Sequence, residues 1–188
     1  MATTQPIKSS EDIQRVRAVL DNKRDRALFE LGLHLAFRGG DLLTLNLRHV
    51  INKVAGDEVI IGAEKKTSKQ RITNLNEQCI DILKPLIRER QREGATLDDA
   101  LFVAQRSKKR LTIVSLSRLW SHWCKLAGLE GTFASHTGRK TKAYIMRVED
   151  EMPIEVLMKV LNHSSPAMTL RYASIQDDEC KQFYMRAL

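Results

Sequence analysis

One short segment of this 188-residue chain has a strand-like pattern, and the sequence on both sides of it has a helical one. Val59 to Ile61 is a β-branched run, Arg71 to Leu75 returns as a second run, and a polar turn joins the two. Strands and helices do not alternate along the chain, which argues against a parallel α/β sheet. We therefore expect a mainly α-helical α+β domain that contains one small antiparallel β-hairpin.

Local signals predict where the helices of the first half begin and end. Ser9 is expected to cap the first helix, because serine accepts a hydrogen bond from a free N–H of the first turn. The apolar segment 25–37 is interpreted as a buried helix that stops at Gly39-Gly40, where a left-handed turn is easy. Asp41 is then expected to cap a short helix through Leu47.

The chain after the hairpin is also predicted to be helical. Expected helices cover residues 78–92, 115–127, 135–148, 153–161, 166–172 and 176–188. Ser135 is a candidate N-cap, and Pro153 and Pro166 suit the first turns of their helices. Trp120 and Trp123 are expected to lie in the core rather than to form a platform for stacking bases.

The size of the chain indicates a single domain over residues 1–188, with residues 1–8 loose and residues 176–188 forming a C-terminal helix or tail. Three widely spaced cysteines, Cys79, Cys124 and Cys180, argue against a disulfide framework or a structural zinc site. No apolar run is long enough for a membrane span, and no signal-peptide pattern is present. A cytoplasmic protein of a bacterium or phage is the expectation.

The positive charge is concentrated in one stretch. Residues 101–142 hold nine lysines and arginines against one acid, Glu130, and the rest of the chain holds 22 basic and 22 acidic residues. The whole net charge of +8 therefore lies in 42 residues. Such a concentration predicts a polyanion such as DNA as the partner. A merely solvated basic face is the alternative.

Four residues near the C-terminus form a set that could break a phosphodiester. His136 and Arg139 lie three residues apart, and Tyr172 follows His163 by nine residues. Tyrosine can supply the attacking oxygen, arginine can hold the phosphate in a bidentate contact, and histidines can hold or move protons. Each residue type is common, so the prediction depends on their order and on what precedes them.

Taken with two earlier blocks, these residues resemble the catalytic domain of the tyrosine recombinases, the phage integrase family. The resemblance runs from about Ile7 to Ser174. Its four blocks are Phe37-Arg38-Gly39-Gly40-Asp41-Leu42-Leu43-Thr44-Leu45, Lys66-Thr67-Ser68-Lys69-Gln70-Arg71, His136-x-x-Arg139, and Leu161-Asn162-His163-Ser164-Ser165 with Thr169 and Tyr172. Three residues depart from the family pattern: Gly138 replaces an apolar residue, Lys140 a frequent histidine, and Asn162 the usual glycine. The N-terminal DNA-clamping domain of typical members is expected to be absent.

The resemblance implies a site-specific recombinase that cleaves and rejoins double-stranded DNA through a 3′-phosphotyrosine, without metal, ATP or another cofactor. Arg38 and Arg139 would bind the phosphate, Tyr172 would attack, and His136 and His163 would hydrogen-bond the phosphate or move protons. Lys66 is the expected general acid for the departing 5′ oxygen, with Lys65 and Lys69 as rivals. Several copies would assemble on the DNA as a homo-oligomer, to which residues 176–188 could contribute in cis or in trans.

Other basic residues are expected to contact backbone phosphates, which position a duplex but carry little sequence information. They are Lys65, Lys69, Arg106, Lys108, Lys109, Arg110, Arg118, Lys125, Lys140 and Lys142. Two alternatives to recombination stay open: a type IB topoisomerase-like relaxation of supercoils, and a non-catalytic accessory or regulatory protein that binds DNA.

Overall fold

The structure, a computed structural model, describes residues 4–62 and 71–173. Among the described residues, six helical segments and a hairpin make up the main body. The helical segments are α1 (Ser10–Ala18), α2 (Lys23–His34), α3 (Gly39–Leu43), a 3₁₀ turn (Leu47–His49), α4 (Glu77–Arg92) and α5 (Ile113–Leu126). The hairpin consists of the strands β1 (Glu58–Ile61) and β2 (Arg71–Asn74). The expected α+β fold with one antiparallel hairpin is confirmed, with Val59 opposite Thr73.

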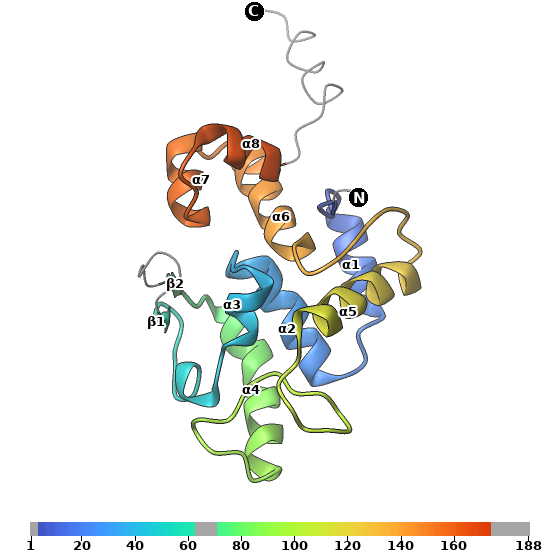
Figure 1. Cartoon of the computed structure of the whole chain (residues 1–188), viewed down its shortest axis with the longest axis vertical. Helices are drawn as coiled ribbons and strands as arrows, with labels where there is room; N and C mark the ends of the chain where they lie inside the picture. The colour runs from blue at the N-terminus through green and yellow to red at the C-terminus, as the bar shows by residue number, and fades with distance from the viewer. Residues whose placement is uncertain (1–3, 63–70, 174–188) are drawn as a thin grey trace, which may run out of the picture.

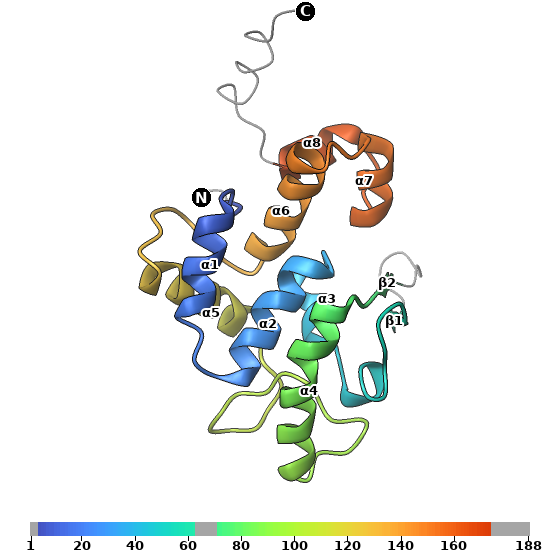
Figure 2. The same cartoon turned by 180° about the vertical axis from the view of Figure 1, so that it is seen from behind.

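The last part of the described chain is helical and lies at one end of the molecule. It contains α6 (Thr137–Tyr144), a π-helical turn (Ile145–Glu149), α7 (Ile154–Leu161) and α8 (Pro166–Ala173). Figures 1 and 2 show these helices at the end opposite α4, with the hairpin at the side of the body beside α3. The helix α6 extends from the body to α7 and α8, and it packs against α2 below and α8 above.

The core is built around α2, which is buried on nearly all sides. Phe29 of α2 stacks on Trp120 of α5, with ring centroids 5.0 Å apart, and Trp123 meets Trp120 edge-on at 5.6 Å. The indole of Trp123 donates to the buried carboxylate of Asp25, 3.3 Å away, so its polar atom is satisfied inside the core. The tryptophans are therefore core residues, as the sequence predicted.

Two expected helix ends are wrong in detail. The helix α2 ends at His34, and the left-handed residue after it is Ala36 (φ 50°), not Gly39 or Gly40, which form the first turn of α3. Gly39 is needed there for close packing, because a Cβ would lie 2.9 Å from Leu116 Cδ2 and 3.0 Å from Ser135 Cβ. Asp41 consequently lies within α3 and does not cap it.

The start of α6 also differs from the prediction. His136 occupies the N-cap position, and Ser135 instead uses its backbone N–H to bond Ser117 of α5, 3.3 Å away. The hydroxyl of Thr137 accepts from the N–H of Ala134 at 2.9 Å and closes the turn before the helix. The prediction that Ser9 caps the first helix, α1, is confirmed, and so is the prediction that Pro166 opens α8.

Candidate active site

Arg139 joins the body to the C-terminal helices. It lies in the first turn of α6, its side chain is 1% exposed, and its two terminal nitrogens donate to the carbonyls of Ala36 and Leu161. Ala36 stands two residues before Arg38, and Leu161 stands two residues before His163. One buried guanidinium therefore holds together the segments that carry two other expected site residues, Arg38 and His163.

His163 follows α7 at a sharp turn of the chain. Asn162 ends that helix in the left-handed region (φ 50°, ψ 52°), which asparagine tolerates better than most residues other than glycine. This accounts for asparagine at the position where the resemblance led us to expect glycine. The turn brings His163 Nε2 to 3.3 Å from Arg139 Nη2 and its Nδ1 to 3.1 Å from the hydroxyl of Thr169.

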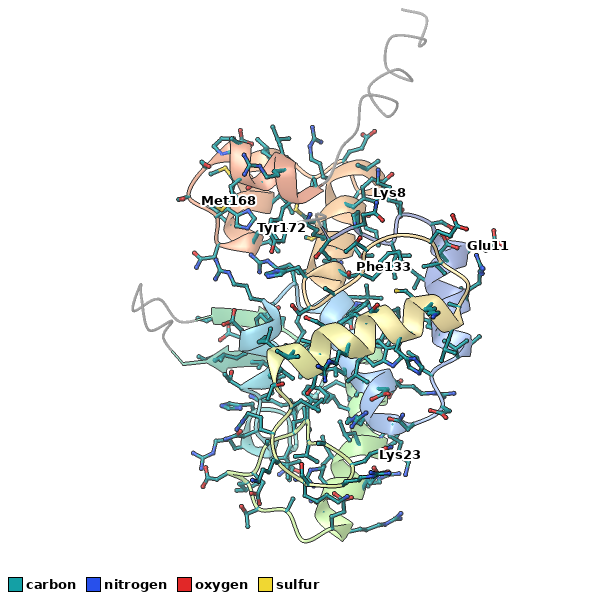
Figure 3. The ribbon with its side chains drawn as sticks, turned by 45° about the vertical axis from the view of Figure 1, so that its right-hand side comes forward. Lys8, Glu11, Lys23, Phe133, Met168 and Tyr172 are labelled. Atoms are coloured by element: carbon teal, nitrogen blue, oxygen red, sulfur yellow. The ribbon has the colours of Figure 1, made fainter. Side chains whose placement is uncertain are left out.

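Tyr172 projects from α8 into the same site, in the angle between α8 and α6 (Figure 3). Its hydroxyl lies 2.6 Å from Nδ1 of His136. The ring of His163 lies edge-on at 4.9 Å between centroids, and the guanidinium carbon of Arg139 lies 5.4 Å from the ring centre. Four sequence-predicted residues from α6, α8 and the turn after α7 thus meet around one phenol.

The environment of His136 suits a proton acceptor. Desolvation of the ring, followed by the charges of Arg139, Lys140 and Arg38, lowers the pKa of His136 below its ordinary value. The imidazole is therefore neutral at neutral pH, and a neutral ring can accept the phenol proton at Nδ1. In the tautomer whose Nδ1 is unprotonated, the contact between Tyr172 and His136 is a hydrogen bond that the tyrosine donates.

Lys140 lies inside the site and not on the outer surface expected of a residue that contacts DNA phosphates. It is 6% exposed, and its ammonium lies 5.6 Å from the centre of the Tyr172 ring. Burial lowers the pKa of Lys140. The structure therefore places this cation against the phenol.

Arg38 occupies the N-cap position of α3 and is half-buried. Its charge contributes to the lowered pKa of His136. The three lysines of the hairpin, Lys65, Lys66 and Lys69, lie outside the described residues, so the structure says nothing about their position.

The remaining basic residues differ in what they present to solvent. Arg106, Lys109, Arg118 and Lys125 are exposed, whereas Lys142 of α6 is only partly so. Lys108 pairs with Glu93 at 2.6 Å, and Arg110 donates to the carbonyl of Leu43 and, at 2.6 Å, to the side chain of Asn46. The basic stretch is therefore divided between an exposed group before and on α5 and a largely buried group on α6.

Sequence reasoning did not assign a role to Thr169 or explain Gly138. Thr169 was noted only for its spacing from Tyr172, but its buried hydroxyl contacts His163. Gly138 lies against α2, where a Cβ would come within 2.8 Å of the Gly32 backbone and of Trp120 Cζ2. Gly32 and Gly138 are both small residues that face Trp120. The sequence does not reveal their contact, because it does not show that α2 and α6 cross at these positions.

Other features bear on cofactors and membranes. Among the described residues, no group of three or more histidine, cysteine or acidic side chains is arranged to hold a metal ion. The helices in this part of the chain are too short or too polar to cross a bilayer. Cys79 and Cys124 are buried free thiols, and desolvation raises the pKa of Cys79 to about 11 and that of Cys124 to about 12.

Comparison with known proteins gives one consistent family. The sequence profile of the Phage integrase family matches residues 9–179. The probable integrase/recombinase YoeC of Bacillus subtilis (strain 168) is 35% identical over 188 residues, which are 98% of this chain and 97% of YoeC. Tyrosine recombinase XerC of Caldanaerobacter subterraneus subsp. tengcongensis is 31% identical over 162 residues, 85% of this chain but only 44% of that XerC.

Solved structures of recombinases share this fold. The crystal structure of XerA recombinase superposes with a TM-score of 0.78 at 24% identity and covers 97% of this chain and 65% of XerA. At this level of identity the likeness establishes the fold. The chain thus spans nearly all of YoeC and about two thirds or less of the recombinases XerA and XerC.

Proposed function

Because the chain belongs to the phage integrase family, we propose that it is a site-specific DNA recombinase that cleaves and rejoins strands through a 3′-phosphotyrosine. The observation that carries this proposal is the 2.6 Å contact between the Tyr172 hydroxyl and His136 Nδ1, beside the guanidinium of Arg139. Attack on a phosphate anion requires a nucleophile, a base and a fixed cation.

The proposed reaction begins when Tyr172 gives its proton to the neutral ring of His136 and its oxygen attacks the phosphorus. The bond between phosphorus and the 5′ oxygen breaks, and the tyrosine remains joined to the 3′ phosphate. Arg38 and Arg139 would neutralise the charge that develops on the non-bridging oxygens. Attack by the 5′ hydroxyl of another strand reverses these steps, so no external energy source is required.

We propose Lys66 as the acid that protonates the departing 5′ oxygen, with Lys65 and Lys69 as competitors. A bridging 5′ sulfur separates them, because a thiolate leaves without being protonated. Cleavage by the Lys66→Ala variant should be slow on the oxygen substrate and restored on the sulfur substrate. If Lys65→Ala or Lys69→Ala behaves in this way instead, the assignment moves to that lysine.

The test of the nucleophile uses DNA from beside the gene, cut into nicked duplexes that release a short strand after cleavage. Wild-type protein should form a covalent complex that survives SDS, and Tyr172→Phe should form none. Tyr144→Phe is the matched control, because Tyr144 is a buried tyrosine of α6 whose ring is covered by Lys8. A covalent complex that persists in Tyr172→Phe would contradict the proposal.

The same preparation distinguishes the alternatives. Recombinant joints between two labelled duplexes would support recombination, and their formation through a multimer should appear as a steep dependence on protein concentration. Relaxation of supercoiled plasmid without any joint would indicate a topoisomerase-like enzyme. Salt-sensitive binding to duplex DNA with no covalent complex on any probe would indicate an accessory protein.

A further inference from the structure

Lys140 is a buried cation that lacks an anionic partner in the described part of the chain. Its side chain is 6% exposed, and within residues 4–62 and 71–173 no carboxylate pairs with its ammonium. By contrast, the buried Glu30 is held by Arg17, and the buried Arg90 is held by Glu93. An unpaired charge inside a protein costs free energy. A lysine in such a place therefore indicates a role other than stability.

The groups around Lys140 are those of the proposed active site. Its ammonium lies 5.6 Å from the centre of the Tyr172 ring, which α8 brings against α6. The other groups at that ring are His136 and Arg139 of α6 and His163 of the turn after α7, and Arg38 of α3 adds positive charge that acts on His136. Within this set, the phenol is the one group that can become an anion.

The contact between Lys140 and Tyr172 should strengthen during the proposed reaction. A cation over the face of a neutral phenol is attracted only by the electron cloud of the ring. When the phenol gives its proton to His136, a full negative charge appears on its oxygen and ring, and the attraction becomes that between two opposite charges in a partly desolvated site. An interaction that is stronger in the charged state than in the ground state lowers the barrier to reaction.

We propose that Lys140 is a further cation of the active site, which stabilises the negative charge on the oxygen of Tyr172. During cleavage the phenol proton passes to His136, the bond from oxygen to phosphorus forms, and the bond to the 5′ oxygen breaks, while Lys140 keeps its proton. During rejoining the same phenolate leaves beside Lys140, so one residue assists both directions. This kinetic role rests on the proposed function.

Two measurements on the full chain test the charge without DNA. Lys140→Met keeps the length of the side chain, and its urea midpoint should equal or exceed that of wild type, because an unpaired buried charge is removed. With ¹³C-labelled tyrosine, the signal that Tyr172→Phe removes identifies Tyr172, and its phenolate should form at a higher pH in Lys140→Met than in wild type. A clearly less stable methionine variant would make Lys140 a structural residue and overturn the proposal. Unchanged ionisation of Tyr172 would also overturn it.

The kinetic arm uses the nicked duplexes at neutral pH. Lys140→Met should cleave about 10- to 100-fold more slowly than wild type, at or below the lower limit for loss of one charge-stabilising group, because this cation acts through the ring. Lys140→Arg should restore most of the rate. Lys8→Met is the matched control, since Lys8 lies 5.0 Å from the ring centre of Tyr144, which has no part in the proposed reaction. The control should cleave at the wild-type rate.

The pH profile separates an effect of charge from an effect of shape. Burial lowers the pKa of Lys140 from its ordinary value of 10.5, so as the pH rises wild type loses the ammonium and its rate should approach that of Lys140→Met. A ratio of the two rates that is constant with pH, or a methionine variant that cleaves at the wild-type rate, would overturn the proposal and leave the proposed function intact. If wild type cleaves no DNA, the proposed function fails, and the tyrosine titration still decides whether Lys140 stabilises the phenolate.

Discussion

Substitution of Gly138 by alanine should damage the site by moving the helix that carries it. Gly138 stands between His136 and Arg139 in the first turn of α6, against α2. An added Cβ would lie 2.8 Å from the backbone carbon and oxygen of Gly32 and 2.8 Å from Trp120 Cζ2. Backbone atoms cannot turn aside as a flexible side chain can, so α6 must move away from α2.

Two opposing terms set the size of the effect. Alanine in a helix is favoured over glycine by at most about 1 kcal/mol. Overpacking a close contact costs about 1–3 kcal/mol, and contact with backbone places this site near the upper limit. The net loss should be about 2 kcal/mol, which lowers the melting temperature of a chain of this size by roughly 4–8 °C.

The assay is urea unfolding of Gly138→Ala together with cleavage of the nicked duplex. Gly40→Ala is the matched control, because it is also a helical glycine, and its added Cβ would meet nothing nearer than Ile113 Cδ1 at 3.8 Å. The control should keep or gain stability. The reasoning is refuted if Gly138→Ala is as stable as Gly40→Ala and cleaves at the wild-type rate.

Three further outcomes can be measured. The pKa of His136 is lowered by desolvation and then by Arg139 and Lys140, so the cleavage rate should stay constant through neutral pH and fall only below the ordinary histidine value of about 6.5; a decline already complete at pH 7 would contradict this. Arg17→Met removes both hydrogen bonds to the buried carboxylate of Glu30 and should lower the free energy of unfolding by about 2–3 kcal/mol, against less than about 1 kcal/mol for Lys23→Met at an exposed pair. Asn162→Gly should leave stability nearly unchanged, whereas Asn162→Ala should lose about 1 kcal/mol because its backbone is left-handed; equal stability of the two variants in denaturant would refute that explanation.

The sequence was sufficient for features that depend on neighbouring residues. Ser9 caps its helix through the N–H of Asp12, and Pro166 opens α8, because caps and proline act within one turn. The hairpin pairing also follows from two β-branched runs around a polar turn. The order of the site residues indicated that His136, Arg139, His163 and Tyr172 belong together, and the structure brings these four to one place.

Features that depend on distant packing could not be derived in this way. The sequence suggested a left-handed turn at Gly39-Gly40. In the structure, Gly39 lacks a Cβ where Leu116 packs closely against it. The left-handed residue is Ala36, whose carbonyl accepts a hydrogen bond from Arg139. Charge counting suggested one continuous basic face. Two residues of that predicted face, Arg139 and Lys140, are buried in the structure. Composition does not show which charged residues lie inside a site.

The two carbonyl contacts of Arg139 make the site dependent on a completed tertiary structure. One contact is to residue 36 and the other to residue 161, so the guanidinium is not held until the chain between these residues has been synthesised and packed. A nascent or partly opened polypeptide can still attract nucleic acid through its exposed lysines and arginines. If the chain acts as proposed, such a polypeptide would bind DNA without cleaving it.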